Sequence, residues 1–145
     1  MEIEIFDEAF EIDIYGFGGI AINKEYGATA FKLSGKMWEA VKADGIKSEG
    51  KNIWVYEDDH RVFAGVEIKS RPSDEVGLEH KKLSLKKYAY YKHVGPYSLI
   101  GQAGNNMTKE LAAKGYATTL PYVEIYGHWN GDETKCETEL FMSLK

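Results

Sequence analysis

The second half of this 145-residue chain repeats the first half at a fixed offset. Met37 corresponds to Met107 and Gly45 to Gly115, each pair 70 positions apart, and no gap is needed between these points. In each half an apolar helical pattern ends at the glycine, and a strand pattern follows. Duplicated units bring equivalent surfaces together, and ligand pockets commonly form at such a junction. The repeat therefore predicts two similar halves with a cleft between them.

Each half is predicted to contain a strand, a helix and two further strands. Apolar residues recur at helical spacing from about 28 to 44 and again from about 97 to 114, and period-two or apolar strand patterns surround both segments. We expect an α+β fold in which one curved, largely antiparallel sheet carries both helices on one face. We expect a single domain over residues 1–145, with repeat one at about 1–70, a linker at 70–77 and repeat two at about 78–145.

A glycine-rich run interrupts the first strand region. Residues 16–19 read Gly-Phe-Gly-Gly and loosely fit a dinucleotide-binding pattern. The residues that follow do not open a helix, so the phosphate site at a helix N-terminus is absent. We therefore expect a bulge or a bend at this run.

Side chains alternate across the matched strands at 52–56 and 122–126. One face is aliphatic and carries Ile53, Val55, Val123 and Ile125. The other face is aromatic with one acid and carries Asn52, Trp54, Tyr56, Tyr122, Glu124 and Tyr126. We expect the helices to cover the aliphatic face and to leave the aromatic face open, as in a binding surface. The alternative is that the aromatic rings only shield the sheet, with their polar ends in water.

Trp54 and Glu124 occupy equivalent positions in the two halves. A ring and a carboxylate on one aromatic face suggest a site for a flat, apolar cation. A half-buried carboxylate can pair with a cation, act as a general base or accept hydrogen bonds from tyrosines. The alternative for Glu124 is a solvated surface residue.

Composition and charge exclude several other classes. The net charge is −5, and the only basic cluster, at 81–87, is more typical of a solvated strand edge than of a nucleic-acid site. The chain shows no secretory signal and no membrane-spanning stretch, and one cysteine fits a reducing compartment, so we expect a cytoplasmic protein. His128, Asp132, Glu133 and Cys136 lack metal-ligand spacing, so we expect no metal and no cofactor.

Four short motifs resemble one known family. They are Lys-Tyr-Ala-Tyr-Tyr-Lys-His-Val-Gly-Pro-Tyr at 87–97, Gly-Tyr at 115–116, Pro-Tyr-Val-Glu-Ile-Tyr at 121–126 and Cys-Glu-Thr-Glu-Leu at 136–140. In this order and spacing they resemble the GyrI-like small-molecule-binding superfamily. That family includes effector-binding domains of multidrug-responsive bacterial transcription activators and bacterial gyrase-inhibitor proteins.

The resemblance implies a tandem strand-helix-strand-strand fold with a ligand cleft at its pseudo-two-fold junction. The family's acidic residue, used against lipophilic cations, lies in the motif that Glu124 matches. Aromatic residues line the family's pocket, and the candidates here are Trp54, Tyr56, Tyr90, Tyr122 and Tyr126. The implied partner is an aromatic or cationic small molecule that the chain binds or sequesters, without direct contact to nucleic acid or membrane.

Two alternatives remain open. Stand-alone relatives in this family resemble hydrolases that open strained cyclopropane rings in genotoxic compounds, and such a reaction here would use Glu124 and Tyr126 as catalytic residues without a metal. A protein-interaction module, such as a gyrase inhibitor, is the other alternative and would need an acidic surface that works without the cleft.

Overall fold

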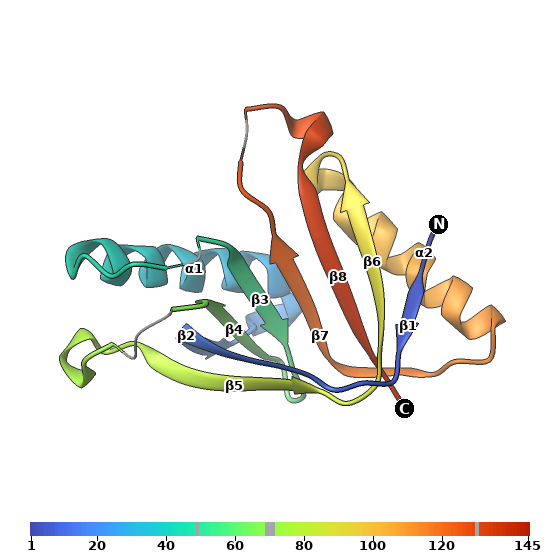
Figure 1. Ribbon diagram of the computed structural model, residues 1–145, viewed down its shortest axis with the longest axis horizontal. Coiled ribbons are helices and arrows are strands. Elements are labelled where there is room, and N and C mark those ends of the chain that lie inside the picture. The colour runs from blue at the N-terminus through green and yellow to red at the C-terminus, as the bar shows by residue number, and fades with distance from the viewer. Residues whose placement is uncertain (49, 69–71, 130) are drawn as a thin grey trace.

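The computed structural model describes residues 1–48, 50–68, 72–129 and 131–145 (Figure 1). In each half of the chain, two strands precede a helix and two strands follow it. The first half contains β1 (Glu4–Phe6), β2 (Phe10–Ile20), α1 (Tyr26–Ala43), β3 (Asn52–Tyr56) and β4 (Arg61–Val66). The second half contains β5 (Glu79–Leu85), β6 (Tyr88–Val94), α2 (Ile100–Ala113), β7 (Thr118–Tyr126) and β8 (Glu137–Leu144). Short 3-10 helices occupy Ile22–Lys24, Asp74–Val76, Tyr97–Leu99 and Glu133–Lys135.

The eight described strands form one antiparallel sheet in the order β1-β6-β8-β7-β3-β4-β2-β5. The two halves meet at the central pair of β3 and β7. Their outer strands are exchanged, because β1 of the first half pairs with β6 and β5 of the second half pairs with β2. The α+β class and the curved antiparallel sheet are as predicted, but each half has one more strand before its helix than expected. Residues 70 and 71, at the start of the expected linker, lie outside the described residues.

The aliphatic face of the central strands does not lie beneath the helices, which corrects the expectation above. Val55 and Val123 instead belong to a core cluster with Ile14 of β2 and Leu83 of β5. Rings from strands that are not paired meet in this cluster: Phe10 of β2 stacks on Phe141 of β8, with centroids 5.2 Å apart. The sheet is strongly bent (Figure 1), and side chains of its own strands cover this face.

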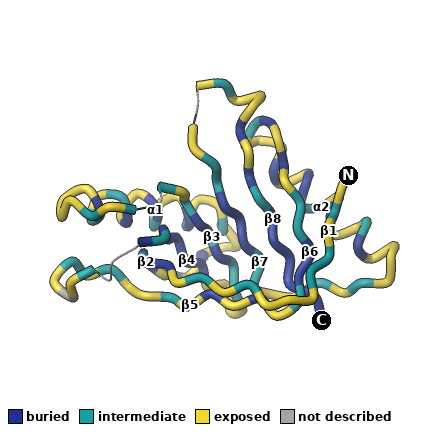
Figure 2. The backbone as a smooth tube through the Cα atoms, viewed as in Figure 1, coloured by how far each residue is buried: buried dark blue, intermediate teal, exposed yellow. Residues whose placement is uncertain are grey.

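Both helices pack on the opposite face, the one that carries the aromatic residues. α1 packs on β2 and β4 through Met37 and Val41, and α2 packs on β6 and β8 through Met107 and Leu111. α1 lies over the strands of the first half and α2 over β6 and β8 (Figure 1), and a cavity lined by residues of both helices opens over β3 and β7. Buried residues are most frequent on β4 and β8, the strands that flank β3 and β7 (Figure 2). The aromatic face is therefore open between the helices and not on the far side of the sheet.

Both helices end in the same way. Gly45 follows α1 with φ of +60° and Gly115 follows α2 with φ of +87°. Each glycine amide donates to the carbonyl three residues before it, and the next amide, of Ile46 or Tyr116, donates to the carbonyl five residues before it. This is the double closure of a Schellman motif, which needs a left-handed residue and favours glycine.

The glycine-rich run does not bend the chain. β2 continues through residues 16–19 and keeps a regular register with β4 from Tyr15 to Ile20. A Cβ atom at Gly16 would lie 1.9 Å from the carbonyl oxygen of Ala64. The glycine therefore allows the close approach of β4, and the expected bulge was wrong because glycine within a strand also serves such contacts.

Candidate functional site

The centre of the sheet places the two matched residues directly opposite each other. In the β3–β7 register Trp54 pairs with Glu124, and the flanking pairs are Asn52 with Tyr126 and Tyr56 with Tyr122. Trp54 and Glu124 are separated by the same 70 positions as the sequence repeat. This is the arrangement expected where a pseudo-two-fold axis passes between these two residues on antiparallel strands. Side chains of paired residues project to the same face of a sheet, so an indole ring and a carboxylate lie side by side on the helix face.

Three tyrosine hydroxyls surround the Glu124 carboxylate. Tyr126 donates a hydrogen bond to Oε1 at 2.5 Å, Tyr122 donates to Oε2 at 2.7 Å, and Tyr56 donates a longer one to Oε1 at 3.4 Å. Glu124 is only 7% exposed. In the described part of the chain no ion pair includes Glu124. A buried carboxylate is therefore stabilised by neutral donors alone.

The three tyrosines stay protonated under ordinary conditions. Burial raises the pKa of Tyr126, Tyr122 and Tyr56 far above the usual range of a phenol, and the negative charge of Glu124 and the hydrogen bonds to it raise each pKa further. A phenol can donate to the carboxylate only while it keeps its proton. The cluster of Glu124, Tyr56, Tyr122 and Tyr126, called here the carboxylate cluster, thus gains no second negative charge from its tyrosines near neutral pH.

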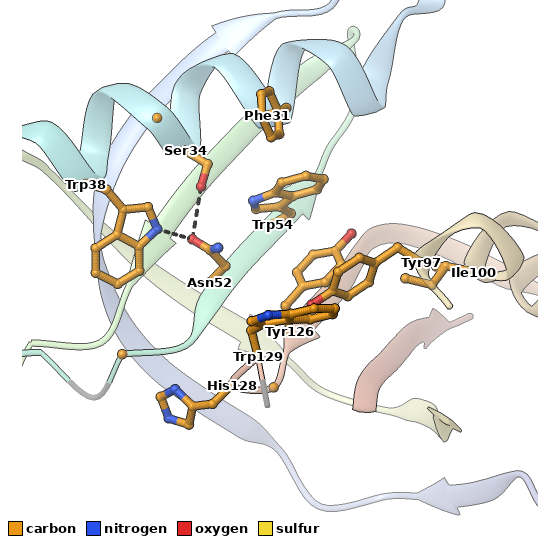
Figure 3. Close-up of a pocket in the computed structure, with 13 residues that line it drawn as sticks. Phe31, Ser34, Trp38, Asn52, Trp54, Tyr97, Ile100, Tyr126, His128 and Trp129 are labelled. Atoms are coloured by element: carbon orange, nitrogen blue, oxygen red, sulfur yellow. Dashed lines mark hydrogen bonds between the residues drawn. The ribbon is translucent and has the colours of Figure 1, made fainter. Parts of the chain in front are cut away.

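A cavity of about 610 Å³ opens beside this cluster, between α1 and the start of α2. Trp54 and Tyr126 form its floor, with ring centroids 4.7 Å apart (Figure 3). Tyr97 packs edge-on against Tyr126 at 5.8 Å, and Trp129 follows Tyr97 at 6.5 Å. Four rings therefore form a continuous series from the floor toward the outside. The volume lies in the range of pockets for drug-sized ligands.

The described wall of this cavity is almost free of charge. Its residues from α1 are Phe31, Ser34, Gly35 and Trp38, and the rest come from the strands and loops around the junction: Gly50, Asn52, Trp54, Tyr97, Ile100, Tyr126, Gly127, His128 and Trp129. His128 is the only titratable group in this set other than the tyrosines. An uncharged aromatic wall is suited to flat, apolar ligands.

The other predicted site residues occupy separate neighbouring spaces. Tyr56 and Tyr122 stack at 5.7 Å and line a shallower hollow of about 350 Å³ with Tyr26 and Leu120. Glu124 itself lines a small cavity of about 220 Å³ under α2. Glu124 is therefore not on the described wall of the main cavity, and Tyr126 connects it to that wall by a hydrogen bond.

Tyr90 does not belong to this site. It pairs with Phe141 in the β6–β8 register and packs into the core cluster on the opposite face of the sheet. Its hydroxyl donates to Glu139 at 2.7 Å. The neighbouring Tyr91 faces the helix side instead, packed beneath α2. The candidate was wrong because a shift of one residue in register exchanges the faces of a strand.

Sequence reasoning missed several cavity residues. Trp38 and Phe31 come from the face of α1 that turns toward β3, and Trp129 comes from the loop after β7. Phe31 is 74% exposed and Trp129 is 60% exposed. Large exposed aromatic residues on a helix and a loop were the available signal, since such side chains gather at binding surfaces.

The described residues contain neither a candidate metal site nor a candidate membrane-spanning helix. No group of three or more His, Cys, Asp or Glu side chains there could hold a metal ion. Within the same residues, neither helix combines the length and the apolar character that crossing a membrane requires.

An antiparallel sheet with two helices that flank an aromatic cavity is the architecture of a ligand-binding domain. Residues 27–145 match the family model of the GyrI-like small molecule binding domain, and the chain belongs to this family. No protein of curated function matches the sequence.

Solved structures share the fold at low sequence identity. The C-terminal domain of EcmrR is 17% identical with a TM-score of 0.76, over 99% of this chain and 97% of that one. SAV2435 bound to tetraphenylphosphonium is 18% identical with a TM-score of 0.63, over 100% and 94%. A hydrolase from Listeria innocua is 12% identical with a TM-score of 0.60, over 99% and 92%. At these identities the likeness establishes the fold alone.

Proposed function

We propose that this chain binds aromatic or lipophilic cationic small molecules in the main cavity. The observation that carries the proposal is the buried Glu124, which no cation in the described residues neutralises and which Tyr126 links to the cavity floor. A bound cation would supply the missing positive charge. That SAV2435, a relative in fold, is bound to tetraphenylphosphonium supports this choice of ligand class.

The arrangement favours a cation without hydrogen-bond donors. Glu124 is not on the described wall of the main cavity and already accepts three tyrosine hydrogen bonds, so an ammonium group in that cavity gains no direct hydrogen bond from it. A quaternary or delocalised cation can instead lie on the rings of Trp54 and Tyr126. Donation to a carboxylate makes a phenol ring richer in electrons, which strengthens its attraction for a cation. Each such contact contributes about 0.5–2 kcal/mol, depending on desolvation.

The test uses two ligands of the same shape and opposite charge, tetraphenylphosphonium and tetraphenylborate. Calorimetry should show much tighter binding of the phosphonium to the parent protein. Glu124→Gln keeps the side-chain size and removes the charge, so it should weaken phosphonium binding by about 1–3 kcal/mol and leave borate binding unchanged or stronger. Equal affinity of the parent protein for both ions would refute the proposal.

A second candidate function is metal-free hydrolysis of strained electrophiles. One observation favours it: the small cavity of about 220 Å³ under α2 gives Glu124 a space of its own, large enough for water. In this reaction Glu124 would position or deprotonate the water and Tyr126 would orient the substrate. The substrate would need a reactive ring, such as a cyclopropane conjugated to a carbonyl.

Turnover separates the two functions. Parent protein, chelator-treated protein and Glu124→Gln are incubated with such a compound, and product is followed over time by mass spectrometry. Hydrolysis predicts product from the first two samples and little from the third. Retention of the unchanged compound by the parent protein supports binding instead.

A further inference from the structure

The orientation of one side-chain amide in the main cavity is fixed by its neighbours. Oδ1 of Asn52 accepts hydrogen bonds from the indole Nε1 of Trp38 at 2.6 Å and from the hydroxyl of Ser34 at 2.9 Å. An indole nitrogen can only donate, so the amide atom that faces Trp38 must be the oxygen. The NH₂ group of Asn52 is therefore turned away from Trp38.

This NH₂ group has no acceptor in the described part of the chain, where the hydrogen bonds of the Asn52 side chain all involve its oxygen. It lies on the wall of the main cavity, on the side toward Trp54 (Figure 3). An amide nitrogen fixed by two bonds to its partner oxygen is a preorganised donor, because rotation of the amide would break both bonds.

A second donor lies beside it. Nε1 of Trp54 is fully buried and has no hydrogen-bond partner in the described structure. Asn52 and Trp54 are two positions apart on β3 and project to the same face. The nitrogen-bearing edge of the Trp54 indole faces Ser34 and Asn52, away from Tyr126 (Figure 3). Two N–H donors thus share the α1 side of the cavity, and Oδ1 of Asn52 already accepts two hydrogen bonds.

We infer that Asn52 and Trp54 form a subsite for an uncharged oxygen acceptor on the ligand, such as a ketone carbonyl. A buried donor without a partner is costly, and a ligand oxygen would satisfy it. An anion fits less well, because the carboxylate of Glu124 lies on the same face of the sheet. The inference rests on the proposed function in using the same cavity. It makes the preferred ligand an aromatic cation with a carbonyl group at the end that points toward α1.

The test compares ligands that differ only in the acceptor. The cationic pair is (4-acetylphenyl)triphenylphosphonium and its 4-isopropenyl analogue, in which CH₂ replaces the carbonyl oxygen. The neutral pair is 4-acetylbiphenyl and 4-isopropenylbiphenyl. The quantity measured is the ratio of the acetyl affinity to the isopropenyl affinity within one protein, which cancels differences in overall binding.

Two substitutions remove the donors. Trp54→Phe deletes the indole N–H, and Asn52→Asp replaces the NH₂ group while it keeps an acceptor for Trp38. Each should lower the acetyl-to-isopropenyl ratio by about three- to tenfold, the value of one hydrogen bond. Trp129→Phe is the matched control, because it removes an exposed indole at the cavity mouth. It can change the affinity for both ligands of a pair, but it should leave their ratio as it is in the parent. Thermal melts confirm that each variant is folded.

An unchanged ratio in both Trp54→Phe and Asn52→Asp would overturn the subsite, even if all phosphonium ions bind tightly. If Trp54→Phe and Asn52→Asp lower the acetyl-to-isopropenyl ratio of the neutral pair, the subsite is supported. This holds even if Glu124→Gln binds cations as tightly as the parent does. The two ideas therefore fail separately: charge selectivity tests the proposed function, and the acetyl ratio tests the subsite.

Discussion

The hydroxyl of Tyr126 donates a 2.5 Å hydrogen bond to Glu124, and Tyr126 lines the main cavity whereas Glu124 lines a separate one. The same residue therefore stabilises the buried charge and forms the surface on which a ligand would lie. The hydroxyl of Tyr126 contacts Glu124, whereas its ring lines the main cavity. Substitutions in the carboxylate cluster should therefore have separable effects on folding stability and on ligand affinity.

Removing single hydroxyls from the carboxylate cluster should destabilise the fold in a graded order. Tyr126→Phe and Tyr122→Phe each delete a short bond to a buried charge and should lower the free energy of unfolding by about 1–3 kcal/mol. Tyr56→Phe deletes a bond of 3.4 Å and should cost less. Urea unfolding of the three variants measures the order, and a larger loss for Tyr56→Phe than for the other two would contradict it.

Stability should fall at alkaline pH. In the unfolded chain a tyrosine has a pKa of about 10, whereas burial raises the pKa of Tyr126, Tyr122 and Tyr56 in the fold. The contribution of these groups is therefore complete below pH ~10 and is lost as the pH rises above that value, since only the unfolded chain then releases the protons.

Thermal melts from about pH 8 to about pH 11 measure this loss. Phenolate absorbance gives a second readout: the three half-buried tyrosines of the carboxylate cluster should ionise only when the protein unfolds. A variant with all three replaced by Phe is the control and should lose less stability over the same range. Early titration of all 10 tyrosines in the folded protein would argue against the buried cluster.

Gly45 and Gly115 should be equivalent in their effect on stability. Both have positive φ, and a Cβ atom at either one would meet nothing within 4 Å, so the cost of substitution is purely conformational. Gly45→Ala and Gly115→Ala should each lower the free energy of unfolding by about 1 kcal/mol. Gly27→Ala in α1 also meets open space but has helical geometry, and it should be neutral or stabilising. Chemical denaturation checks the opposite signs.

Tyr90→Phe should leave ligand affinity unchanged. The ring lies on the far face of the sheet, and the substitution removes only the bond to Glu139. Tetraphenylphosphonium titrations of this variant and of Tyr126→Phe separate the two faces. A marked loss of affinity in Tyr90→Phe would mean that the ligand reaches the other side of the sheet.

The sequence repeat predicted that equivalent strands of the two halves meet at the centre of the site. Trp54 and Glu124 are 70 positions apart and pair directly, whereas Ile53 pairs with Ile125, so the pseudo-two-fold axis passes between Trp54 and Glu124. Strand alternation then assigns Tyr122 and Tyr126 to the face of Glu124. These inferences need only local pattern and symmetry.

Local pattern and symmetry do not predict which face of the sheet the helices cover, nor which residues form the outer wall of the main cavity. Strand alternation places Val55 and Trp54 on opposite faces of the sheet. It does not predict which of these side chains points toward the helices. That choice depends on how far the sheet bends, which lets Phe10 reach Phe141 across strands that are not paired. Trp38 likewise reaches the site only through the packing of α1 on the sheet, and its partner Asn52 gives no sign of this in the sequence.

The exchanged edge strands restrict how the cavity can open. The chain crosses the junction between β1 and β2 and again between β5 and β6, so two straps join the halves in addition to the β3–β7 ladder (Figure 1). A hinge motion that drew the two sides of the sheet apart would have to break the β3–β7 pairing and stretch the short connections at 7–9 and 86–87. We therefore expect ligands of different size to be accommodated by rotation of the exposed side chains of Phe31 and Trp129 and not by separation of the two sides of the sheet.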